Sequence, residues 1–85
     1  MKYRKKPVVI EAIQWKGQNF NEILTLSKKD GMDLNIEVFE DFITIYTLEG
    51  EHRCSLNDWV IQGVQGELYP CKPDIFEATY ERVEE

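Results

Sequence analysis

Beyond residue 34, hydrophobic side chains alternate with other residues at a period of two. Leu34, Ile36 and Val38 form the first alternating run. Such alternation is typical of a β-strand that buries one face. Pairs of turn-forming residues, Glu40-Asp41 and Glu49-Gly50, interrupt the pattern at short intervals. Because short strands joined by tight turns pair with their neighbours, this part of the chain predicts an antiparallel sheet.

The same reasoning applied to the whole chain gives six expected strands and two expected helices. The strands are expected over residues 8–15, 34–39, 42–48, 51–55, 59–61 and 67–71, and the helices between residues 19 and 31 and over residues 75–80. Pro70 has no N–H to donate, so it places the last strand at an edge or a bulge. The order β-α-β-β-β-β-β-α predicts an α+β fold, in which one main helix packs on a small, curved, mostly antiparallel sheet.

Each expected helix begins with a capping signal. Asn19 precedes the first helix, and Glu22 follows three residues later, which is the spacing of a capping box. Gly31 is expected to end this helix, because glycine adopts the left-handed conformation without strain. Asp74, followed by Glu77, is expected to cap the second helix.

The length of 85 residues predicts a single domain over residues 1–85, with residues 1–6 as a basic arm leading into the first strand. Apolar residues make up 42% of the chain and charged residues 31%, which indicates a globular protein rather than a disordered one. No apolar stretch follows the arm as it would in a signal peptide, and none is long enough to span a bilayer. We therefore expect a cytoplasmic protein.

The charge is distributed unevenly. The chain has sixteen acidic and ten basic residues, a net charge of −6, and four of the bases lie in residues 1–6. The rest of the chain is therefore strongly acidic. Affinity for nucleic acid comes mainly from the neutralisation of phosphates, so nucleic-acid binding is not expected. An acidic surface that docks on a basic partner is compatible with this charge.

The only histidine and the two cysteines are the first candidates for chemistry. His52 and Cys54 share one face of a strand, and Cys71 is the other cysteine. A hydrolase would have to use His52, with Cys54 or Ser55 as nucleophile, but no nucleophile motif surrounds them. The spacing of the three residues matches no known zinc knuckle, and cysteines of a cytoplasmic protein are normally reduced. We expect neither a metal nor another cofactor, nor a disulfide.

Other polar motifs carry less information. Acidic pairs at turns, such as Glu49 with Glu51, are typical of solvated loops rather than of an acid and its base. Gly63 and Gly66 bracket a tight connection and do not form a phosphate-binding motif.

Aromatic residues are numerous for so small a core. Six of them lie in expected strands or in the last expected helix: Trp15, Tyr46, Trp59, Tyr69, Phe76 and Tyr80. Core packing accounts for some of them, and a partner surface is the alternative, since aromatic residues are enriched at the centres of interfaces. We expect a homo-oligomer.

Two blocks of the sequence carry a resemblance to a known family. Residues 3–15 read YRKKPVxIEAxQW, and residues 58–81 read DWVIxGVxGExYPCKPDIFExTYE, where x marks positions outside the pattern. Together they resemble a family of small bacteriophage and prophage proteins of unknown function, whereas residues 16–57 match no known pattern. The family's usual glycine before the Asp-aromatic pair is Asn57 here, and asparagine tolerates the positive φ of a turn. The resemblance implies an accessory protein made inside an infected bacterium, and it supplies no catalytic positions.

These observations predict a non-enzymatic binding protein in the cytoplasm of the host bacterium. It is expected to counter a host defence by sequestering a small nucleotide-like signalling molecule or by inhibiting a host protein. The expected ligand-binding residues are Arg4, Arg53, Trp59 and Tyr69. One alternative is a structural or assembly module that docks through an acidic face. A small hydrolase that uses His52 is a third possibility.

Overall fold

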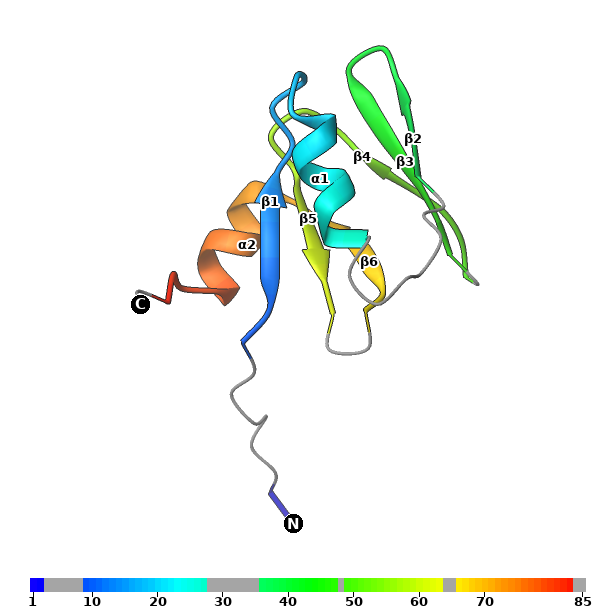
Figure 1. Cartoon of the computed structure of the whole chain (residues 1–85). Coiled ribbons are helices and arrows are strands. Elements are labelled where there is room, and N and C mark those ends of the chain that lie inside the picture. The colour runs from blue at the N-terminus through cyan, green and yellow to red at the C-terminus, as the bar shows by residue number, and fades with distance from the viewer. Residues whose placement is uncertain (3–8, 28–35, 48, 64–65, 84–85) are drawn as a thin grey trace.

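The computed structural model of the chain describes residues 1–2, 9–27, 36–47, 49–63 and 66–83 (Figure 1). These residues form six strands and two helices. In chain order they are β1 (Glu11–Gln14), α1 (Phe20–Ser27), β2 (Ile36–Phe39), β3 (Phe42–Thr47), β4 (Gly50–Cys54), β5 (Trp59–Gln62), β6 (Leu68–Cys71) and α2 (Pro73–Thr79). The predicted α+β class is confirmed.

The strands are divided between two antiparallel sheets. One has the order β1-β5-β6 and the other the order β2-β3-β4. The prediction of a single sheet is therefore wrong. The reason is that β1 and β6, the edge strands of one sheet, do not pair with β2 or β4 of the other, because the described strands of the two sheets pack their apolar faces into one shared core. The two helices are of similar length, eight and seven residues, so neither is the one main helix that was expected.

The hydrophobic core lies between the two sheets and α1. The buried residues of this cluster are Trp15, Ile23, Leu26, Ile43, Ile45, Cys54, Val60 and Leu68. Trp15 also joins the sheets directly, because its Nε1 donates a hydrogen bond of 2.7 Å to the backbone oxygen of Asp41 in the β2–β3 turn. Burial of this one large side chain therefore fixes how the two sheets meet.

The opposite face of the β1-β5-β6 sheet is covered as well. Ile61 is fully buried but lies outside the core cluster, since it points away from its neighbour Val60. Trp59 shares the face of Ile61, and its ring stacks on Phe76 of α2. Figure 1 shows α2 and α1 on different sides of β1 and β5. This sheet is thus the middle layer of three.

The first strand is shorter than predicted. Trp15 leaves the ladder, because its N–H donates to Asp58 O and its C=O accepts from Asn57 N, so two residues of the partner segment oppose one. Asn57 has a φ of 73°, which confirms that asparagine supports the turn here. At the other end, residue 8 lies outside the described residues.

The predicted turns and the edge position of the last strand are largely confirmed. Glu40, with a φ of 48°, and Asp41 join β2 to β3. Pro70 lies in β6, an edge strand of its sheet. Gly50 has a φ of 120° but already pairs with Thr47, so it is the first residue of β4 rather than the second residue of a turn.

The first helix begins where predicted, but not through the predicted cap. The backbone oxygen of Asn19 accepts hydrogen bonds from the amides of Glu22 and Ile23 at 3.1 and 3.2 Å. Its side chain faces backward instead: Oδ1 accepts from the amide of Lys16, and Nδ2 donates to Gln14 O. The capping-box prediction is therefore wrong. Gly31, the expected end of the helix, lies outside the described residues.

The last helix begins two residues earlier than predicted. Lys72 occupies the N-cap without a side-chain hydrogen bond, and Pro73 is the first helical residue. Proline suits this position, since its fixed φ is helical and the N–H that it lacks would have no partner there. Asp74 is consequently not the cap but lies inside the first turn, where a carboxylate interacts favourably with the helix dipole. Among the described residues, no helix has both the length and the apolar character that a membrane span requires.

Candidate functional site

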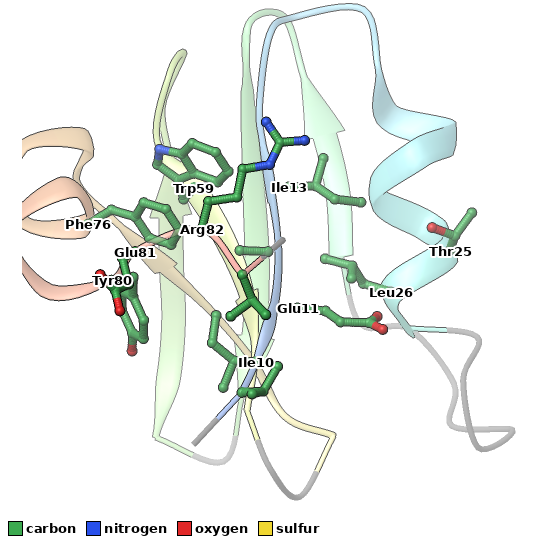
Figure 2. A pocket seen from close by; sticks show the side chains of 13 residues that line it. Ile10, Glu11, Ile13, Thr25, Leu26, Trp59, Phe76, Tyr80, Glu81 and Arg82 are labelled. Carbon is green, nitrogen blue, oxygen red and sulfur yellow. The ribbon is translucent and has the colours of Figure 1, made fainter. Parts of the chain in front are cut away.

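A groove of about 660 Å³ runs along β1 (Figure 2). Five consecutive residues, 9–13, line it. Because successive side chains of a strand point to opposite faces, a groove that touches three consecutive residues of β1, Glu11 to Ile13, follows the edge of the strand rather than one face. Among the described strands, β1 pairs only with β5, which leaves its other edge available.

One wall of the groove is a stack of three aromatic rings. The rings of Trp59 and Phe76 lie 4.1 Å apart between centroids and are 10° from parallel, and Tyr80 continues the stack 5.1 Å from Phe76. Phe76 and Tyr80 are four residues apart and so lie on one side of α2 and its C-cap. The wall therefore combines a strand residue with two residues that follow it in the last segment of the chain.

Tyr69 lies behind this wall, on β6 opposite Ile61 and next to Tyr80. Burial, and to a smaller degree the neighbouring Tyr80, raises the pKa of Tyr69 to about 12. Tyr69 is therefore a neighbour of the aromatic stack and not part of the groove lining.

The second wall comes from the end of α1. Thr25 and the buried Leu26 line the groove on the side of β1 that faces away from α2. The side-chain amide of Gln62 donates to the backbone oxygen of Leu26 and so ties the end of α1 to β5. Both walls are therefore attached to the central strand of the same sheet.

Charged groups of both signs line the groove. Glu11 comes from β1, and Glu81 and Arg82 come from the segment after α2. Figure 2 shows the Arg82 side chain between Trp59 and Ile13. The Nε1 of Trp59 is buried and has no hydrogen-bond partner among the described residues. A buried donor of this kind normally costs about 1–3 kcal/mol until it finds an acceptor.

The expected ligand-binding residues do not form one cluster. Trp59 lines the groove, and Tyr69 lies behind its wall. Arg53 lies on β4 of the other sheet, where its guanidinium carbon is 3.9 Å from the centre of the Phe42 ring. Arg4 lies outside the described residues. Of the three that the structure describes, only Trp59 is among the residues that line the groove.

Lys72 is not among the residues that line the groove and instead contacts a buried carboxylate. Its Nζ lies 3.0 Å from Asp58 Oδ2, and the same oxygen accepts a hydrogen bond from the amide of Ser55. Asp58 is only 3% exposed, so the ammonium group compensates a buried carboxylate. Lys72 therefore stabilises the turn before β5.

The residues considered for catalysis or metal binding are engaged elsewhere. The Nε2 of His52 lies 3.2 Å from Thr47 Oγ1 at the end of the β3–β4 hairpin. Cys54 is fully buried, and this burial raises its pKa to about 12, while burial also raises the pKa of Cys71. Both thiols are free. Within the described part of the chain, no three His, Cys, Asp or Glu side chains are grouped so that they could hold a metal ion.

Several groove residues could not be identified from the sequence. Ala12 and Ile13 line the groove because they lie along the edge of β1 that is unpaired among the described strands. A residue pattern does not show which edge of a strand is unpaired. Arg82 lies in no recognisable motif, so the sequence does not predict its place in the groove. The spacing of Phe76 and Tyr80 was the one available signal, since two aromatic residues four apart mark one side of a helix.

The chain was compared with models of protein families, with curated proteins and with solved structures. None of the three comparisons found a match.

Proposed function

We propose that this chain is a non-enzymatic binding protein that holds its target in the groove along β1. The observation that carries the proposal is the groove itself, which has apolar walls and a few charged groups at about 660 Å³. Ligand sites in proteins typically have this size and this combination of groups. Trp59 is the expected anchor, because its flat ring forms part of the wall.

The placement of the reactive side chains supports binding rather than catalysis. A nucleophile needs a base within hydrogen-bond reach, and a thiol attacks only as thiolate. With a pKa of about 12, the Cys54 thiol remains protonated at neutral pH. His52 interacts with Thr47 and does not line the groove.

The proposed setting is the cytoplasm of a phage-infected bacterium, where the protein counters a host defence or regulator. This part of the proposal is supported by the resemblance of residues 3–15 and 58–81 to small phage proteins. Those two blocks include β1, β5, β6 and α2, which supply the edge of the groove and its aromatic wall. The segment without resemblance, residues 16–57, supplies α1 and the other sheet.

A host protein is the favoured target. The chain has a net charge of −6, and Arg82 is the only cationic side chain among the described residues that line the groove. Both facts disfavour a ligand with several phosphates. A nucleotide-like molecule with little negative charge remains a second candidate, because the Trp59–Phe76 stack offers a surface on which a base could pack.

Native mass spectrometry of the tagged chain, purified from bacteria that express it, tests the proposal. We expect a host protein to co-purify with the chain, and Trp59→Ala to lower its amount at least tenfold. The matched control Phe42→Ala, which removes an aromatic ring from the other sheet, should leave that amount unchanged. A bound mass of a few hundred daltons that is lost with Trp59→Ala would favour the nucleotide-like candidate.

Three results would contradict the proposal. Equal retention by Trp59→Ala would place the partner outside the groove and favour docking through an acidic face. If the original chain and both variants show only the mass of the chain itself, with no bound partner, the proposed binding function is wrong. Hydrolytic activity abolished by His52→Ala would favour the hydrolase.

A further inference from the structure

The backbone of β1 presents hydrogen-bonding groups to the groove. Trp15, directly after the strand, donates its N–H to Asp58 O at 2.9 Å and accepts from Asn57 N at 2.7 Å, so its backbone groups face β5. In an antiparallel ladder the direction of these groups alternates along the strand. Ile13 therefore also faces β5, whereas the N–H and C=O of Gln14 and Ala12 face outward.

The contacts of Gln14 agree with this alternation. Its carbonyl oxygen accepts a hydrogen bond of 2.9 Å from Asn19 Nδ2, which approaches from outside the sheet. Asn19 therefore closes this end of the edge. Ala12 is the next outward residue along β1, and within the described part of the chain its N–H and C=O have no hydrogen-bond partner.

These groups face a groove that is apolar on both sides of the strand. On one face of the sheet the groove continues to Trp59 and Phe76, and on the other it reaches Leu26. Any occupant that excludes water from this groove must satisfy the Ala12 N–H and C=O or leave them unpaired at a cost. An extended peptide satisfies both groups and also presents side chains alternately to the two walls.

We propose that the groove binds an extended segment of a partner protein, which adds to β1 as a fourth strand and pairs with Ala12. This inference rests on the proposed binding function and specifies its partner. β1 has four residues, so the paired segment is about 13 Å long at 3.3 Å per residue. Its central residues are mainly apolar, since Trp59 and Phe76 line one wall and Leu26 contributes to the other.

The charge of the chain defines the flanks of the segment. The net charge of −6 favours lysine or arginine on either side of the apolar centre, and among the described residues that line the groove Arg82 is the single cation, next to Glu81. A second copy of this chain is the less suitable occupant, because it carries the same negative charge. Self-pairing through β1 is an outcome that the experiments below distinguish.

Amide hydrogen exchange followed by NMR tests the pairing in the unmodified protein. The probe is a panel of capped peptides with three central positions drawn from Val, Ile, Leu, Phe, Tyr and Thr, flanked by lysines. We expect at least one peptide to slow exchange of the Ala12 amide tenfold or more, while the Ile13 amide, already paired with β5, does not change. The same peptide with an N-methyl group at its centre, or with glutamates as flanks, is expected to bind at least tenfold more weakly.

Ala12→Pro provides a second test. It removes the outward N–H but no hydrogen bond to β5, a position at which edge strands tolerate proline. We expect at least a tenfold loss of peptide affinity with an unchanged circular dichroism spectrum. Should this variant unfold, the exchange experiment on the unmodified protein still decides.

The outcomes separate this inference from the proposed function. A partner that depends on Trp59, without protection of Ala12 by any peptide of the panel, would overturn strand addition and leave the binding function intact. Protection of Ala12 that rises with protein concentration in the absence of peptide would show self-pairing and overturn the choice of occupant. Absence of both a partner and peptide binding would overturn both proposals.

Discussion

The two sheets of this domain are covered to different degrees. In the β1-β5-β6 sheet, Val60 packs into the core on one face and Ile61 is equally buried on the other, each with 0% exposure. In the β2-β3-β4 sheet, Ile43 and Ile45 are buried on one face, whereas on the other face Thr44 is buried but Phe42 is half-buried and Phe39 is exposed. The comparison teaches that the groove belongs to the sheet whose strands are held from both sides.

The course of the chain explains this difference. α2 begins two residues after β6, so its aromatic side chains cover the sheet to which β6 belongs. The three strands of the other sheet follow one another through short turns. The support for the edge of β1 therefore comes from β5 and from residues 73–83, and the other sheet contributes mainly core packing.

The largest effect is expected where the two sheets meet. Trp15→Ala removes a fully buried ring and the hydrogen bond to Asp41, and we expect it to lower the free energy of unfolding by about 3–5 kcal/mol. The total free energy of unfolding of so small a domain is only slightly larger than this loss. Urea titrations should therefore show a large unfolded fraction of the variant already at zero urea. Trp15→Phe retains most of the packing and should cost less than half as much. A loss below about 1 kcal/mol for Trp15→Ala would show that the sheets do not depend on this contact.

Alkaline pH should lower the free energy of unfolding through Cys54, which is buried in the core between the two sheets. In the unfolded chain this thiol ionises near pH 9, and burial raises its pKa to about 12 in the folded protein. Between these values the unfolded chain has lost a proton that the folded protein retains. The contribution of Cys54 to the free energy of unfolding should therefore be constant below about pH 9 and fall by about 1.4 kcal/mol per pH unit up to about pH 12.

Cys54→Val is the matched control for this pH dependence, because it retains a small apolar side chain without the titrating thiol. Urea titrations at several alkaline pH values should give a shallower dependence for this variant than for the original chain. The remaining slope is expected to come partly from Tyr69, whose pKa is also raised to about 12. Parallel curves for the two proteins would contradict burial of the thiol between the sheets.

The smallest effect is expected on the open face of the second sheet. Phe42→Ala removes a ring that stacks on Phe39 at 5.7 Å and lies under Arg53, with a cost of about 1 kcal/mol or less because the site is solvated. Phe76→Ala removes an aromatic ring that stacks on both Trp59 and Tyr80, and should cost about 2–3 kcal/mol. Equal losses of stability for the two variants would contradict the view that the β1-β5-β6 sheet is covered on both faces and the β2-β3-β4 sheet on one.

Local features of this fold were predictable from the sequence, and long-range ones were not. Alternation and turn residues located most strands, and Pro70 correctly placed β6 at an edge. Alternation does not report which strands pair, and β1 pairs with β5 rather than with a strand near it in the chain. The division into two sheets follows from that pairing and was missed.

The candidate site shows the same limit. Trp59 could be identified from its residue type, because a large aromatic ring is a common binding anchor. Ala12 could not, since its contribution is the direction of its backbone groups, which depends on the pairing with β5. Asn19 was recognised as the residue before a helix, but its side chain turned toward Gln14, a contact set by the tertiary structure.

The insertion of one whole sheet between two neighbouring strands of the other has a consequence for the order of folding. β2, β3 and β4 pair with their sequence neighbours, and hairpins of this kind form within about 1–10 μs. β1 must wait for residues 59–62, and closing a loop of that length carries a larger entropic cost. We therefore expect the β2-β3-β4 hairpins to form early and the groove to be completed last, after α2 has docked. During that interval β1 is exposed along both edges, and a partner segment present at that stage would compete with β5 for the same strand.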